Sequence, residues 1–101
     1  MASFYIEEYV GEAKGVNGPI SGVDGLLQAV QKVTSSTSAA QSSAVSQATQ
    51  YVVLTTDNIG VSHYAVGDNP TATTSDSPIT GGVVRKVAIR PGQKVSVIDE
   101  A

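Results

Sequence analysis

The single histidine is the first residue to consider for chemistry, because imidazole serves both as a catalytic base and as a metal ligand. His63 lies in the middle of the run 61–66, and the chain has no cysteine and no second histidine. A catalytic triad or metal site needs such partners, and the Gly-x-Ser-x-Gly motif is also absent. The sequence favours His63 as a packed or cross-strand polar residue and predicts no enzyme activity and no cofactor.

Three loop carboxylates are candidates for a calcium site, because calcium prefers oxygen ligands. Asp57, Asp68 and Asp76 lack the dense one-in-two spacing of a calcium loop, so their positions indicate turn capping. The glycine-containing segments 11–15 and 81–82 lack the strand, turn, helix and placed lysine of a phosphate loop. The sequence therefore predicts no metal and no nucleotide site.

The charges argue against nucleic acid as a partner. Six basic against nine acidic residues give a net charge of −3, whereas nucleic-acid affinity depends on clustered basic side chains. Four of the basic residues do lie close in sequence: Arg85, Lys86, Arg90 and Lys94. They are interpreted either as a solvated strand face or as a docking patch for an acidic protein surface. Glu7, Glu8 and Glu12 are the acidic counterpart, compatible with head-to-tail subunit contacts or with internal pairing.

Aromatic and apolar side chains gather near the N-terminus. Phe4, Tyr5 and Tyr9 are either core residues or anchors of an arm that binds a neighbour, and the sequence leaves both readings open. The residues that we consider candidates for an interface are Phe4, Tyr5, Ile6, Tyr9, Arg85, Lys86 and Arg90.

Length and composition indicate one domain with a weakly charged surface. The chain has 101 residues, 41% of them hydrophobic and only 15% charged, so Ser, Thr, Gln, Asn and Gly must cover much of its surface. Such a surface loses little ion hydration on contact with another protein. The absence of cysteine fits folding in a reducing cytosol and does not exclude secretion. The N-terminus lacks the features of a signal peptide and no run approaches ~20 apolar residues, so we expect no membrane association.

The second half of the sequence predicts four strands, at 50–56, 61–66, 83–90 and 94–98, because β-branched residues dominate these runs. Turn residues at 57–60 and at Pro91-Gly92 predict two hairpins, and the polar stretch 67–78 predicts an exposed loop. The residues expected in the core are Tyr51, Val53, Val66, Val87, Ile89, Val95 and Val97.

The first half is less regular. Residues 4–10 indicate an edge strand or arm, and five glycines in 11–25 indicate an extended segment. Residues 26–33 fit a helix capped by Asp24 or a strand, and the β pattern of the chain favours the strand. Residues 34–49 have the composition of a linker, with a short strand allowed at Ala44 and Val45. We therefore predict an all-β fold, a small antiparallel β-sandwich or jelly-roll-like barrel over 26–101, with an extended N-terminal arm over 1–25.

Three motifs resemble a family of small virion proteins of tailed bacteriophages. They are the strand ATQYVVLTTD at 48–57, the loop AVGDNPTAT at 65–73 and the terminal strand PGQKVSVI at 91–98. The resemblance covers 48–98 and, more loosely, 4–10, while the glycine-rich 11–25 departs from it. It implies a capsid cement or decoration protein, whose partners are the major capsid protein and copies of itself as dimers or trimers. The implied location is the capsid surface of a virion made in a bacterial cytoplasm.

Two other functions stay open at the level of sequence. One is a neck or tail component of the same kind of particle. The other is a carbohydrate- or ligand-binding β module, whose recognition surface would consist of His63, Tyr64 and the loop 68–77.

Overall fold

The computed structural model describes residues 2–15 and 18–100, with the side chains of 2–11 and 27–100, and these residues fold as β-strands and loops. Within these residues there are eight strands and no helix. The strands are β1 (Ala2–Gly15), β2 (Gly18–Ser35), β3 (Ala40–Gln41), β4 (Tyr51–Thr56), β5 (Val61–Gly67), β6 (Ser77–Thr80), β7 (Arg85–Ala88) and β8 (Lys94–Asp99).

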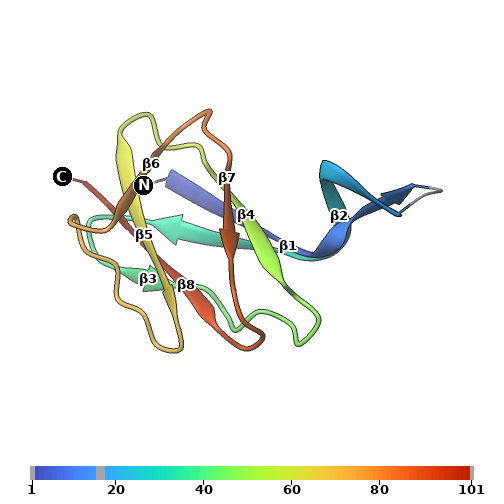
Figure 1. Ribbon diagram of the computed structural model, residues 1–101. Coiled ribbons are helices and arrows are strands. Elements are labelled where there is room, and N and C mark those ends of the chain that lie inside the picture. The colour runs from blue at the N-terminus through green and yellow to red at the C-terminus, as the bar shows by residue number, and fades with distance from the viewer. Residues whose placement is uncertain (1, 16–17, 101) are drawn as a thin grey trace.

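The strands form two antiparallel sheets of four strands each (Figure 1). The first, sheet A, has the order β2-β1-β4-β7, and the second, sheet B, has the order β3-β8-β5-β6. No described strand of one sheet is paired with a strand of the other, so the strands do not close into a barrel. The all-β, antiparallel prediction is confirmed, and the barrel alternative is not.

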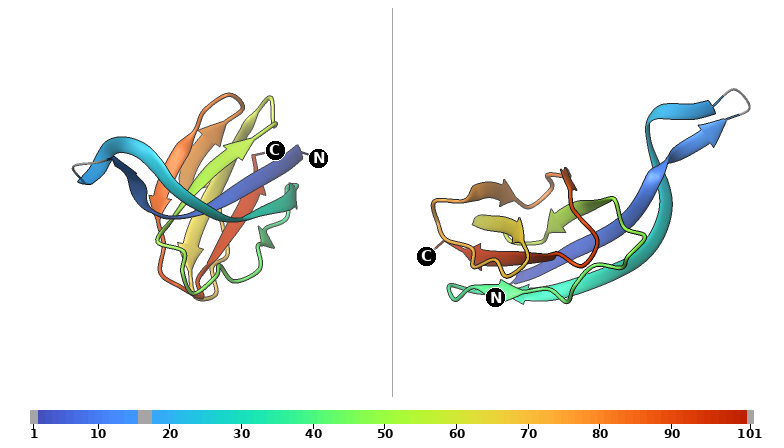
Figure 2. Two further views of the ribbon diagram at one scale, coloured as in Figure 1. Left: turned by 90° about the vertical axis from the view of Figure 1, so that its right-hand side faces the viewer. Right: turned by 60° about the horizontal axis from the view of Figure 1, so that its bottom comes forward.

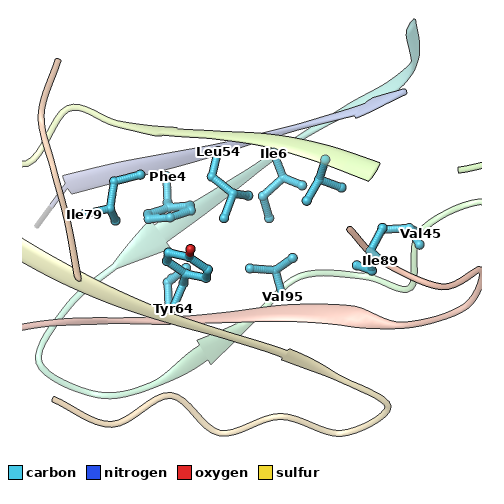
Figure 3. Packing of buried hydrophobic residues seen from close by; sticks show 10 residues of the cluster. Phe4, Ile6, Val45, Leu54, Tyr64, Ile79, Ile89 and Val95 are labelled. Atoms are coloured by element: carbon cyan, nitrogen blue, oxygen red, sulfur yellow. The ribbon is translucent and has the colours of Figure 1, made fainter. Parts of the chain in front are cut away.

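The core lies between the two sheets and takes alternate residues from each strand, as the period of two in a strand requires. Figure 3 shows Phe4, Ile6 and Leu54 of sheet A pointing toward Tyr64 and Val95 of sheet B. The buried cluster consists of Phe4, Ile6, Val45, Val52, Leu54, Tyr64, Ile79, Ile89, Val95 and Val97. Val33, Val66 and Val87 are half-buried against it.

The core prediction for β4 is confirmed for Val53, which is 4% exposed, whereas Tyr51 is only half-buried. The cluster between the sheets takes Val52 and Leu54 instead, and Tyr51 and Val53 lie on the opposite side of sheet A. All three of Val52, Val53 and Leu54 are apolar, so alternation alone does not say which face is internal. The predictions for Ile89, Val95 and Val97 are confirmed, since each is buried in the cluster.

Both predicted hairpins are wrong in their pairing. β4 and β5 belong to different sheets, and so do β7 and β8, so the turns at 57–60 and 91–92 cross from one sheet to the other. The turn chemistry itself is as expected, since Gly92 has a φ of 83° and Gln93 N–H donates to the Arg90 carbonyl. The crossing lets Leu54 of β4 and Tyr64 of β5 meet across the core instead of side by side.

The first half of β1 is part of the folded body and not a separate arm. Residues Phe4–Tyr9 pair with β2 on one side and with β4 on the other, which makes β1 a central strand. The predicted division at residue 25 therefore does not match the structure. The prediction of a strand at 26–33 is confirmed, because β2 covers it.

The second half of the β1–β2 hairpin leaves the body as a two-stranded ribbon, described over residues 11–15 and 18–25, which we call the ribbon. Beyond Tyr9 the pairing with β4 ends, while β1 and β2 remain paired through Gly15↔Gly18. The ribbon projects from one end of the body, away from the N- and C-terminal ends of the chain (Figures 1 and 2). The molecule is consequently elongated, with extents of 48 × 26 × 20 Å.

The serine- and alanine-rich stretch 36–50 is ordered by hydrogen bonds to its neighbours. Ser42 N–H donates to the Val95 carbonyl and Val45 N–H to the Gln93 carbonyl, so the stretch runs beside β8. The short strand in it is β3, at Ala40–Gln41, not at 44–45 as the sequence indicated, and Val45 enters the core from a loop.

Candidate binding surface

The outward face of sheet A is the candidate binding surface. Strand alternation and register place the following side chains on this side: Tyr5, Glu7 and Tyr9 from β1, Leu27, Val30 and Lys32 from β2, Tyr51, Val53 and Thr55 from β4, and Lys86 from β7. We call this set the tyrosine face. It has three of the four tyrosines of the chain, and it carries Leu27 and Val30, which are strongly exposed apolar residues among the described side chains of β2.

Two tyrosines form the firmest part of the face. The rings of Tyr9 and Tyr51 stack with centroids 5.5 Å apart and planes 10° apart, as a directly opposed pair on β1 and β4. Tyr9 Oη also donates to Glu7 Oε1 over 3.4 Å. Stacked cross-strand aromatics hold each other's orientation, so this pair is a rigid part of the tyrosine face.

The remaining face is apolar with charge at its margins. Val53 is only 4% exposed although it points outward, because neighbouring side chains cover it. Leu27 and Val30 are 51% and 54% exposed, which is high for large apolar residues within a strand. Lys32 Nζ lies 5.9 Å from the centre of the Tyr5 ring, a cation–π distance. The face can therefore bury apolar and aromatic area and offer a cation beside it.

The outward face of sheet B, in contrast, is covered by the chain itself. Ala72, in the loop between β5 and β6, donates its N–H to Ser96 Oγ and is 2% exposed. Gln41 Nε2 donates to Asn69 Oδ1 and to the Pro70 carbonyl, which fixes the same loop. The two sheets thus differ, and the open one is sheet A.

His63 is a buried structural residue beneath this loop region. Its side chain is 7% exposed, with Nδ1 2.8 Å from the Asp76 carbonyl and Nε2 3.0 Å from Glu100 Oε1. The bond to the Asp76 carbonyl raises the pKa of His63, burial lowers it, and Glu100 raises it further, with a net rise. Tyr64 is buried in the core, and its hydroxyl accepts from Arg85 Nη1 at 3.4 Å. The prediction that His63 and Tyr64 belong to a ligand surface is therefore wrong, because both side chains are buried. The rest of that predicted surface, the loop 68–77, is largely exposed.

Glu8 is a buried carboxylate at the base of the ribbon. It receives hydrogen bonds from Gln31 Nε2 at 3.0 Å, Ser46 N–H at 2.9 Å and Thr49 Oγ1 at 2.8 Å. Burial raises the pKa of Glu8, but these three donors outweigh it and lower the pKa overall. Two of the donors, Ser46 and Thr49, belong to the loop 42–50, so Glu8 fixes this loop against sheet A.

A depression of about 620 Å³ opens beside the ribbon base. Its lining is Val10, Gln47, Ala48, Thr49, Gln50, Ile89, Arg90 and Pro91. Gln50 is central here, because its Oε1 accepts the Gly11 N–H at 2.7 Å where Gly11 takes a φ of 61°. This contact holds the root of the ribbon at the point where β1 loses β4 as a neighbour.

The residues predicted for an interface do not all lie on one surface. Tyr5, Tyr9 and Lys86 lie on the tyrosine face. Phe4 and Ile6 have no exposed surface, so the prediction that they contact a partner is wrong.

The basic cluster also separates. Arg85 takes the inward side of β7, Lys86 the outward side, Lys94 begins β8 in the other sheet, and Arg90 lines the depression. The predicted single docking patch of these four residues is therefore not formed within one copy of the chain.

Sequence reasoning missed Tyr51, Leu27, Val30 and Lys32 as surface residues. The alternation Tyr5-Glu7-Tyr9 beside Phe4 and Ile6 identifies only the outward residues of β1. The four missed residues join them through strand register, which the sequence does not show.

Among the described side chains no group of histidine and carboxylate residues is arranged to hold a metal ion. In the same part of the chain there is no helix capable of crossing a bilayer. Comparison of the sequence with protein-family models, and of the chain with curated proteins and solved structures, gives no match.

Proposed function

We propose that this protein is a non-enzymatic structural module that attaches to another protein through the ribbon and the adjoining tyrosine face. The two sheets serve as a β-sandwich scaffold for that surface. The observation that carries the proposal is the ribbon itself, whose strands pair only with each other beyond Tyr9. An isolated two-stranded ribbon is only marginally stable in water, so contact with a partner would supply the burial that the body does not provide.

The particular role that we propose is capsid cement in a tailed bacteriophage, with the major capsid protein as partner and the capsid surface as location. Support comes from the motif resemblance over 48–98, the low charge of the surface and the open tyrosine face. A module that bridges two shell subunits adds interface that must break before the shell opens. Dimers or trimers of such a module gain avidity, because each bound copy raises the local concentration of the next.

The experiment uses particles that lack this protein, to which purified protein is added before co-sedimentation. The key variant deletes residues 12–24 and joins Gly11 to Gly25. Because Val10 pairs with Leu26, the junction becomes a two-residue hairpin of glycines, which suits such a turn. A matched control replaces Thr73 with Ala, which changes a distant exposed loop.

Wild type and the Thr73→Ala control are expected to bind saturably, and the deletion variant at least about tenfold more weakly, or ~1.4 kcal/mol. Thermal unfolding of the deletion variant establishes that the body stays folded. Equal binding by the deletion variant would show that the ribbon is not the attachment element. Absence of binding by wild type would contradict the capsid role altogether.

A further inference from the structure

Along the free edge of β2, backbone N–H and C=O groups point away from sheet A and have no hydrogen-bond partner within the described chain. The carbonyls of Ser3 and Tyr9 accept hydrogen bonds from Asp57 and Gln50, so the odd residues of β1 direct their backbone toward β4. The even residues of β1 then face β2, because backbone direction alternates along a strand.

This alternation fixes the direction of the β2 backbone. Phe4 and Ile6 are paired with Val33 and Gln31, so these two residues of β2 face β1. Val30, Lys32 and Thr34 consequently direct their N–H and C=O groups away from the sheet. All three side chains are exposed, with Val30 at 54%. The edge therefore offers a row of free donors and acceptors, which is a template for another strand.

The charge of this edge identifies the kind of strand that fits. Lys32 is the only charged residue between Leu27 and Ser35, and it lies in the middle of the free row. A second copy of β2 paired antiparallel about Lys32 would put lysine opposite lysine, which is unfavourable. A strand with a carboxylate opposite Lys32 and β-branched neighbours would instead gain an ion pair and cover Val30.

We infer that the edge of β2 at Val30–Thr34 accepts an extended segment of a different protein, with an acidic residue opposite Lys32. This inference rests on the proposed function, because it specifies how the attached partner is recognised. The added strand would extend sheet A beside the tyrosine face, so edge pairing and side-chain contact would act on one partner together.

A peptide experiment on the isolated full chain tests this inference without particles. The probe is the blocked heptapeptide Thr-Val-Thr-Glu-Thr-Val-Thr, and the control peptide has Lys in place of Glu. Amide hydrogen exchange is followed by NMR at Val30, Lys32 and Thr34. At millimolar concentration the Glu peptide is expected to slow exchange of these three amides by at least about tenfold, and the Lys peptide is expected to have no effect.

Three variants separate backbone pairing from charge. Lys32→Pro removes an outward N–H without removing a bond to β1, so it is expected to fold and to lose the protection. Lys32→Thr retains the N–H and is expected to weaken the preference for the Glu peptide. Lys32→Glu is expected to reverse this preference, so that the Lys peptide gives the stronger protection. Thermal unfolding of each variant establishes that β2 still pairs with β1.

Three results would overturn the inference: equal protection by both peptides, no protection by either, or protection that depends on protein concentration without peptide, since the last would show self-pairing. Failure here is distinguishable from failure of the proposed function. If Lys32→Pro binds particles as wild type does while the deletion of 12–24 does not, attachment holds and strand addition at this edge is wrong.

Discussion

At the scale of single residues, two buried ionisable side chains, Glu8 and His63, form hydrogen bonds to distant segments. Glu8 accepts these bonds, whereas His63 faces acceptors. Glu8 is a carboxylate surrounded by three donors, so the charged form is stabilised. His63 has an acceptor at each ring nitrogen, so the doubly protonated imidazolium is the form that satisfies both contacts. Each group therefore makes stability depend on pH, with opposite signs.

Replacing Glu8 with Gln is expected to reduce the free energy of unfolding at pH 7 by about 1–3 kcal/mol, because a buried donor loses its acceptor. The pKa of Glu8 is lowered on folding, so its contribution is present above the unfolded value near 4.5 and is lost as pH falls through the folded value. Urea unfolding should therefore show the difference between wild type and Glu8→Gln narrowing below pH 4.5. Glu7→Gln is the matched control, and parallel pH curves for wild type and Glu8→Gln would contradict this assignment.

Replacing Glu100 with Gln is expected to lower the pKa of His63, because it removes the charge beside Nε2 while the Asp76 carbonyl remains. The folded pKa of His63 is raised, so its stabilisation is full below 6.5 and disappears as pH rises through the folded value. NMR titration of the His63 ring in both proteins measures this directly. An unchanged pKa in Glu100→Gln would mean that the contact with Glu100 does not persist in solution.

At the scale of elements, one face of β1 packs in the core and the other belongs to the tyrosine face. Phe4→Ala is expected to cost about 3–5 kcal/mol of stability, because it empties a fully buried site between the sheets. Tyr5→Ala, one residue away on the tyrosine face, should cost only about 0.5–1 kcal/mol, mainly the contact with Lys32. Denaturant unfolding compares the two, and similar losses would show that the face assignment of β1 is wrong.

The strands themselves could be predicted from the sequence, but their partners could not. β-branched composition located β4, β5 and β8, and glycine and proline located the turns, because both signals are local. Whether a turn joins strands within one sheet or carries the chain to the other depends on which apolar faces meet. For 51–56 both faces are apolar in part, so alternation gave no answer.

Only part of the tyrosine face could be predicted from the sequence, because composition is a local signal and strand pairing is not. Tyr5 and Tyr9 were identified as aromatic residues of the N-terminal strand, but the partners beside them come from β2 and β4. Leu27 and Tyr51 join Tyr9 only through strand register. A bulge between Glu8 and Tyr9 shifts the β1–β2 register, and no local pattern in the sequence marks it.

At the scale of the whole molecule, one sheet is covered by its own loop and the other is open and continues into the ribbon. Particles without the protein are expected to release DNA at lower temperature, because binding to the closed shell stabilises it by mass action. A His63→Ala protein that is shown to fold should attach to particles as wild type does, since His63 is buried away from the tyrosine face. Co-sedimentation measures this attachment and fluorescence of a DNA dye during heating measures the release, and identical release with and without the protein would contradict a cement role.

The amount of this protein in purified particles, measured by quantitative mass spectrometry against the major capsid protein, tests the central proposal most directly. A cement protein that bridges shell subunits must be present in an amount comparable to the major capsid protein, and that is the result we predict. A content limited to a single ring of copies would indicate a neck or tail component, and absence from the particle would contradict the proposed function.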